Sequence, residues 1–294
     1  MFRYLLILSV AVIVSNGSPA TKQGNFNTYF AYTRKNLNRP IELKAGEINE
    51  EAVVDLTLNK TTVVIIHGHR GSVSTTLNPT VKNAFLRSED LDVIVVDWSV
   101  YASQSYSNAV NAVPSVGENL VGLINELVRN GVVELSTLHM VGFDLGAHVA
   151  GFAGRLLDGQ VARITGLNPS RGQWGENSQR LSSSDAVYVE VIHTDGIGLV
   201  AYGVGDAIGD VDFYVNGGTN QPGCLLNNFC GHNRAWEVFA ASLSNTKLIG
   251  NECNTWLQVT LNTCRGPTIE MGGNDLFKYA SGMYRVNTRR RFPF

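Results

Sequence analysis

Residues 142–146, Gly-Phe-Asp-Leu-Gly, constrain this chain more than any other segment. An apolar run precedes them and a helical pattern begins at Leu145, so the segment predicts a sharp strand-to-helix turn. In the G-x-S-x-G form of this turn, the glycines allow close packing and the central serine stands above a sheet as a nucleophile. The central residue here is Asp144. The sequence therefore predicts a nucleophile elbow that carries a carboxylate.

Two later positions follow in the chain order nucleophile, acid, histidine that such a site requires. The strand-like run 162–167 ends at Asn168, where an orienting acid is expected. His232 precedes a helical pattern of apolar residues. The three positions therefore predict one site at the ends of neighbouring strands.

A backbone oxyanion hole is expected beside the elbow. The apolar run 62–66 leads into His67-Gly68-His69. In hydrolases of this type, an N–H just after such a strand and the N–H after the nucleophile hold the oxyanion. These positions assign the hole to the backbone of His69 and Leu145.

Ordered motifs over nearly the whole mature chain carry a resemblance to a known family. They are Tyr32–Asn36, Val64–Gly68, Val95–Ser99, Gly142–Gly154, Thr165–Pro169, Val191–Asp195, Asp212–Tyr214, Asn216–Gly218, Gln221–Cys224 and His232. With them the chain resembles the neutral, pancreatic-type lipases, which include venom and insect phospholipases A1 and the fly yolk proteins. The resemblance implies an α/β-hydrolase fold, in which a mostly parallel central sheet is covered by helices on both faces.

Carried over residue by residue, the family's nucleophile position is Asp144, its acid position is Asn168 and its base is His232. Only His232 is retained, so the triad is degenerate, as in the fly yolk proteins. A carboxylate that attacked an acyl carbon would form a mixed anhydride, which is higher in energy than the ester it replaced. Because a helix N-terminus favours negative charge, we expect the Asp144 carboxylate to occupy the oxyanion hole or to pair with protonated His232.

These substitutions predict a protein without catalysis, and the resemblance to the yolk proteins implies that it binds or stores a lipid or another hydrophobic small molecule. One alternative is an active carboxylic ester hydrolase of the triacylglycerol lipase or phospholipase A1 kind. Another is a hydrolase that uses Asp144 as nucleophile on epoxides or alkyl substrates, as some α/β-hydrolases do. That alternative needs an acid for His232, which Glu190 or Asp195 would have to supply.

Length and charge suit one large domain and exclude a nucleic-acid partner. The chain has 294 residues and a formal net charge of −2. Residues 1–17, with Arg3 and then an apolar run too short to span a bilayer, predict a signal peptide. We therefore expect a single lipase-like domain over 18–294, secreted and without a transmembrane anchor. Peripheral contact with a lipid surface is compatible with this, and no cofactor or metal ion is expected.

Four cysteines, at positions 224, 230, 253 and 264, allow three pairings. Their spacing is unlike paired C-x-x-C zinc ligands and the expected compartment is oxidising, so disulfides are favoured over zinc. The family resemblance and proximity in sequence favour Cys224–Cys230 and Cys253–Cys264. Asn59, in Asn-Lys-Thr, is a candidate glycosylation site.

A short lid is expected, because only five residues separate Cys224 from Cys230. In family members with a lid, this loop covers the acyl site; one this short cannot form a helix there. Leu225, Leu226 and Phe229 then either edge an open cleft or pack beneath the loop. Because the chain ends at Phe294, no C-terminal β-sandwich domain of the larger lipases is expected.

Alternating patterns predict the elements of the sheet and its helices. Apolar runs without alternation, such as Val63–Ile66, are typical of strands buried on both faces of a parallel sheet. A helix is expected over 117–130, where apolar residues have helical spacing. The other expected strands are 92–96, 138–143, 162–167 and 187–193, and a second expected helix covers 147–156.

Overall fold

The structure is a computed structural model that describes residues 26–48, 53, 56, 60–244 and 246–294. The expected signal peptide, 1–17, and the sequon residue Asn59 lie outside the described residues. The described helices and strands are, in chain order, β1 (Thr28–Tyr32), β2 (Ile41–Leu43), β3 (Thr62–Ile66), α1 (Leu77–Ser88), β4 (Asp92–Asp97), α2 (Ser99–Ala102), α3 (Tyr106–Arg129), β5 (Leu138–Phe143), α4 (Leu145–Leu156), β6 (Arg163–Leu167), β7 (Val189–His193), β8 (Val211–Val215), α5 (Asn228–Ser242), β9 (Ile249–Cys253), α6 (Trp256–Leu261), β10 (Thr268–Glu270) and β11 (Gly282–Val286).

Within these residues, one 11-stranded sheet runs through the molecule in the order β10-β9-β11-β8-β7-β6-β5-β3-β4-β1-β2. The strands from β4 to β11 in this order are mutually parallel. Antiparallel pairs occur at both edges, where β1 pairs with β2 and β4, and β9 pairs with β10 and β11. This confirms the predicted, mostly parallel sheet.

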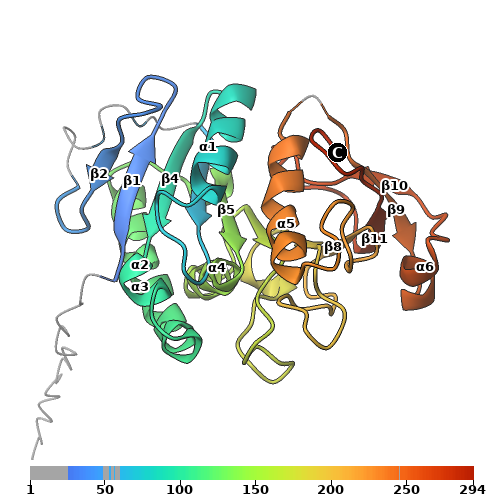
Figure 1. The fold of residues 1–294 in the computed structure, drawn as a ribbon. Coiled ribbons are helices and arrows are strands. Elements are labelled where there is room, and N and C mark those ends of the chain that lie inside the picture. The colour runs from blue at the N-terminus through green and yellow to red at the C-terminus, as the bar shows by residue number, and fades with distance from the viewer. Residues whose placement is uncertain (1–25, 49–52, 54–55, 57–59, 245) are drawn as a thin grey trace, which may run out of the picture.

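Helices cover both faces of the sheet (Figure 1). The strand β3, Thr-Val-Val-Ile-Ile, is buried along its whole length, as its unbroken run of β-branched residues predicts. Side chains of α3 and α4 share one apolar core with one face of the sheet, and side chains of α1 and α5 share the other. This doubly covered arrangement places the carboxyl ends of the parallel strands together at one edge, where a site can form.

The helix α3 begins at Tyr106, upstream of the predicted start at 117. Pro114 lies inside it, and an interior proline ordinarily breaks a helix. The first turns persist because the Ser105 hydroxyl caps them by accepting the N–H of Asn108, and because Ala109 and Val113 are buried against the core. Among the described residues, no helix is long and apolar enough to cross a membrane.

Candidate active site and ligand cleft

The elbow sits where β5 ends and α4 begins. Asp144 lies between them with φ 55° and ψ −120°, a conformation that few side chains adopt. A Cβ at Gly142 would come within 2.2 Å of the Gly146 carbonyl oxygen, and a Cβ at Gly146 within 2.2 Å of the Ile66 oxygen. Both positions therefore require glycine, and the turn has the geometry of a nucleophile elbow.

The Asp144 carboxylate lies against the expected oxyanion-hole donors. Its Oδ2 accepts the backbone N–H of His69 at 2.8 Å. Burial raises the pKa of Asp144, but contact with His232 and the N–H groups of His69 and Leu145 outweighs it and lowers the pKa to about 2. Gly68 makes this approach possible, since a Cβ there would lie 2.5 Å from Oδ2. The carboxylate is ionised at neutral pH and uses the donors that an oxyanion would need.

Asn168, at the end of β6, is fixed in one orientation by the backbone after β7. Its Oδ1 accepts the N–H groups of Thr194 at 2.9 Å and Asp195 at 3.0 Å. Its Nδ2 therefore faces Nδ1 of His232, 2.5 Å away. A flipped amide would place a donor against two N–H groups and leave them unsatisfied, so the structure allows only this orientation.

The orientation of Asn168 sets the tautomer of His232. An NH₂ group donates to Nδ1, so Nδ1 acts as acceptor and the imidazole proton resides on Nε2. Nε2 faces Oδ1 of Asp144 at 3.5 Å. A working triad needs the reverse tautomer, with the proton on Nδ1 and a free lone pair on Nε2. The expected pairing of Asp144 with His232 is present, and it is made through Nε2.

Neither candidate replacement acid forms a hydrogen bond or an ion pair with His232. The Asp195 carboxylate accepts the Asn228 side-chain amide at 2.9 Å and the Tyr202 N–H at 3.0 Å. Glu190 is buried farther along the sheet, where it pairs with Arg163 at 3.0 Å and Lys278 at 2.6 Å. The acid that an aspartate nucleophile would require is thus not supplied by either residue.

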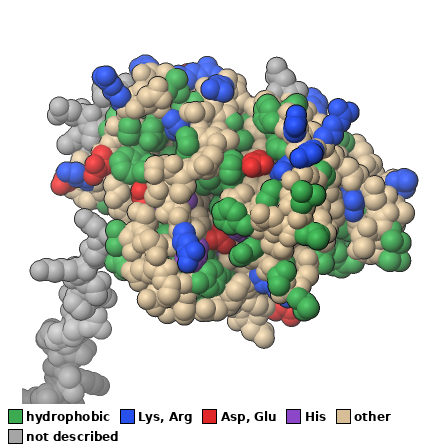
Figure 2. Space-filling model, viewed as in Figure 1, with side chains coloured by type: hydrophobic (Ala, Val, Ile, Leu, Met, Phe, Trp, Pro, Cys, Tyr) green, Lys and Arg blue, Asp and Glu red, His purple; other side chains and the backbone are tan. Residues whose placement is uncertain are grey.

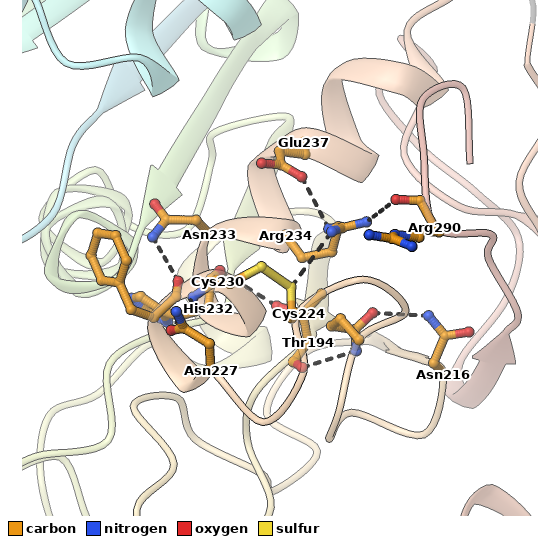
Figure 3. Close-up of a disulfide and its surroundings, with 12 residues drawn as sticks. Thr194, Asn216, Cys224, Asn227, Cys230, His232, Asn233, Arg234, Glu237 and Arg290 are labelled. Atoms are coloured by element: carbon orange, nitrogen blue, oxygen red, sulfur yellow. Dashed lines mark hydrogen bonds and ion pairs between the residues drawn. A yellow bond between two sulfur atoms is a disulfide. The ribbon is translucent and has the colours of Figure 1, made fainter.

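A disulfide holds the end of α5 that carries His232 (Figure 3). Cys224 is joined to Cys230, in the first turn of the helix, and the Asn227 side chain caps that turn by accepting the Cys230 N–H at 3.1 Å. Arg234 donates toward Cys224 Sγ at 3.5 Å. The loop and helix therefore form one unit behind the imidazole. The second disulfide joins Cys253 to Cys264, away from this site.

The cleft has two arms, which meet at Asp144 and His232. One arm, of about 740 Å³, is lined by residues that include Leu77, Phe143 and Trp236. The other, of about 510 Å³, is lined by residues that include Tyr106 and Tyr202. His69, Arg70, Asp144, Phe229 and His232 line both arms. Acidic, basic and histidine side chains meet in a hollow rimmed by hydrophobic side chains on this face (Figure 2).

The short disulfide loop leaves the cleft open. Phe229 lines both arms and is 67% exposed. Leu225 and Leu226 are 88% and 79% exposed, so they do not pack beneath the loop, and neither lines the two arms. Of the three residues expected at the edge of the cleft, only Phe229 contributes to its wall. In the part of the chain that the structure describes, no group of three His, Cys, Asp or Glu side chains could hold a metal ion.

Fold and elbow together define an α/β-hydrolase. Residues 13–274 match the lipase family, and the chain belongs to that family. It is 37% identical over 246 residues to lipase member H-A of Xenopus laevis, and the aligned region covers 79% of this chain and 52% of that protein. It is 33% identical over 244 residues to phospholipase A1 member A of Bos taurus, covering 78% and 52%.

The chain spans about half the length of these relatives, 52% in each case. Among solved structures, dienelactone hydrolase from Anabaena variabilis is similar, with 13% identity, a TM-score of 0.38 and coverage of 57% of this chain and 73% of that one. So low a score adds no argument of its own. The predicted family and fold class are confirmed by the family match and the sheet.

Proposed function

We propose that this protein is a secreted, non-catalytic member of the lipase family that binds a lipid or another hydrophobic small molecule in the cleft. One observation carries the proposal: the Asp144 carboxylate stands in the nucleophile position and itself accepts the His69 N–H. The donors are therefore occupied by an anion, and a developing oxyanion would meet a negative charge there. The two disulfides favour an oxidising, extracellular compartment.

The changed side chains remove the chemistry of acyl transfer at two points. Loss of the nucleophile from a serine triad costs roughly 10⁶ in turnover, and an amide in place of the acid costs about 10⁴. These losses do not add, because the residues act as one unit. His232 holds its proton on Nε2, so it has no lone pair there to accept one. Ester hydrolysis by this route would be close to background.

The cleft supports a binding role. Its arms have volumes within the range of small-molecule sites, and their walls combine aromatic and aliphatic side chains with a few polar groups. A storage role without a ligand would leave this open, partly apolar hollow without a use. Mass spectrometry of organic extracts from native protein tests the proposal, since a bound hydrophobic molecule is expected at near-stoichiometric amount.

The decisive comparison uses the parent protein and the double variant Asp144→Ser with Asn168→Asp, which rebuilds the serine triad. Both would be assayed with short acyl esters and phospholipid. We expect turnover only in the double variant, with Asn168→Asp alone as the matched control. Turnover by the parent that disappears in Asp144→Ala would overturn the proposal.

A second candidate function is supported by the split roles of the two Asp144 oxygens. Oδ2 is held by the His69 N–H, while Oδ1 faces His232 and the cleft. On an epoxide, Oδ1 would attack a ring carbon and break its C–O bond, giving a hydroxyalkyl ester whose new hydroxyl takes its proton from water. A further water must then hydrolyse that ester. His232 cannot activate that water in its present tautomer, so we expect the ester to accumulate. Incubation with an epoxide followed by intact-mass measurement would reveal such an adduct.

A further inference from the structure

The junction of the two arms carries a carboxylate that no lysine or arginine neutralises in the described residues. Asp144 is ionised, and His232 faces it only through Nε2, 3.5 Å from Oδ1, because Nδ1 accepts the Asn168 amide. Within the described residues, no Lys or Arg side chain forms an ion pair with Asp144, whose side chain is 10% exposed. Arg70 lines both arms, but it is an exposed residue and makes no such pair.

This charge changes which head group the junction can hold. In a lipase the backbone donors bind an acyl oxygen, but here Asp144 Oδ2 already accepts the His69 N–H. A ligand therefore meets carboxylate lone pairs, which accept hydrogen bonds and cannot donate them. An ester offers only acceptors, and a fatty-acid carboxylate adds like-charge repulsion. A hydroxyl or ammonium group supplies the missing donor.

We infer that the cleft selects amphiphiles whose head group donates a hydrogen bond to Asp144, an alcohol or an amine, over carboxylates and esters of the same chain. The inference rests on the proposed binding function and names its ligand class. The apolar chain would lie in either arm, against Phe143 and Trp236 or against Tyr106 and Tyr202. Hydrogen bonds that involve an ionised partner are the stronger kind, so the head group would decide affinity within a series of equal chain length.

The test is calorimetric titration of the full protein with decanol, decylamine, decanoate and methyl decanoate, each below its micelle concentration. We expect the alcohol and the amine to bind about tenfold or more tightly than the other two. In Asp144→Asn, which keeps the shape and removes the charge, the preference for the amine over decanoate should disappear. Asp144→Ser serves the same purpose if the amide variant does not fold.

Asp206→Asn is the matched control, because Asp206 pairs with Arg180 outside the cleft and its loss should leave the ranking unchanged. Decanoate binding as tightly as decylamine would overturn the inference, assign recognition to Arg70 and leave the binding function standing. A preference that survives unchanged in both Asp144 variants would equally overturn the role of Asp144. If none of the four ligands bound, the proposed function would fail together with the inference.

Discussion

Asn168 Nδ2 and His232 Nδ1 lie 2.5 Å apart, with the amide fixed as donor and the imidazole as acceptor. An acid at this position would accept a hydrogen bond from Nδ1–H, whereas the amide donates one to the Nδ1 lone pair. A single change from carboxylate to amide thus reverses which nitrogen of His232 carries hydrogen. The reversal disables the base without displacing it.

Exchange of the amide for an acid should therefore be visible on the imidazole itself. In Asn168→Asp, His232 would lie between two carboxylates, and we expect both ring nitrogens to carry protons at neutral pH. In the parent, only Nε2 should carry one. Nitrogen-15 NMR of the histidine side chains distinguishes these states, and His232→Gln identifies the resonances. A parent spectrum with the proton on Nδ1 would refute the assigned tautomer.

Gly68 should be intolerant of even a methyl group. A Cβ there would lie 2.5 Å from both Cβ and Oδ2 of Asp144, so Gly68→Ala must displace the carboxylate. We expect a loss of roughly 1–3 kcal/mol in the free energy of unfolding, as for other overpacked sites. Gly175→Ala is the control, because no atom lies within 4 Å of its added Cβ. Urea denaturation of both variants gives the comparison; equal stabilities would contradict the close approach.

His148 should make the fold sensitive to mild acid. It is buried, with Nε2 bonded to the Ser170 carbonyl and Nδ1 accepting the Leu181 N–H, and burial lowers its pKa from 6.5 to about 4. Below pH 6.5, His148 is protonated in the unfolded chain but stays neutral in the folded protein. The free energy of unfolding therefore falls as pH drops from 6.5 to about 4. This amounts to roughly 3 kcal/mol.

The variant His148→Gln lacks this titration. As pH drops from 6.5 to about 4, the free energy of unfolding of this variant should therefore rise steadily relative to that of the parent. Urea denaturation at each pH measures the difference. A constant difference between the two proteins across that interval would show that His148 does not titrate as described.

The two disulfides should differ in their effect on the cleft. Each closes a short loop, with sequence separations of 6 and 11, and its removal should cost roughly 2–3 kcal/mol of stability. Only Cys224–Cys230 restrains the helix turn that carries His232. We expect serine substitution of that pair to weaken ligand binding, while serine substitution of Cys253 and Cys264 leaves it unchanged. Thermal unfolding and calorimetry, run on both double variants, separate the two effects.

Local sequence predicted the elbow, the strands around it and the positions beside it, because glycine spacing and apolar runs act over a few residues. It could not predict the orientation of Asn168, which depends on N–H groups of Thr194 and Asp195 at the end of the neighbouring strand. Tyr106 and Tyr202 were also missed as cleft residues. They belong to no motif, and only the packing of α3 and the loop after β7 brings them to Asp144.

The start of α3 was missed for a related reason. Pro114 is a strong local signal against a helix, and burial of the preceding turns against the core overrides it. Local preference sets the expectation in such a case, and tertiary packing decides the outcome. In the loop between Cys224 and Cys230, the constraint is covalent. The disulfide closes a loop of five residues, and Leu225 and Leu226 both adopt left-handed backbone conformations that apolar side chains seldom take.

The backbone of Asp144 keeps the strained conformation of a nucleophile elbow, which costs on the order of 1–3 kcal/mol of stability. Glycine adopts such angles freely, so Asp144→Gly would relax the main chain and empty the space that the carboxylate fills. The backbone N–H groups of His69 and Leu145 would then face an empty anion-binding site. Added formate or acetate should bind there and stabilise this variant, by an amount that rises with the logarithm of the anion concentration once it exceeds the dissociation constant. The former nucleophile position would then be a binding site for a small anion.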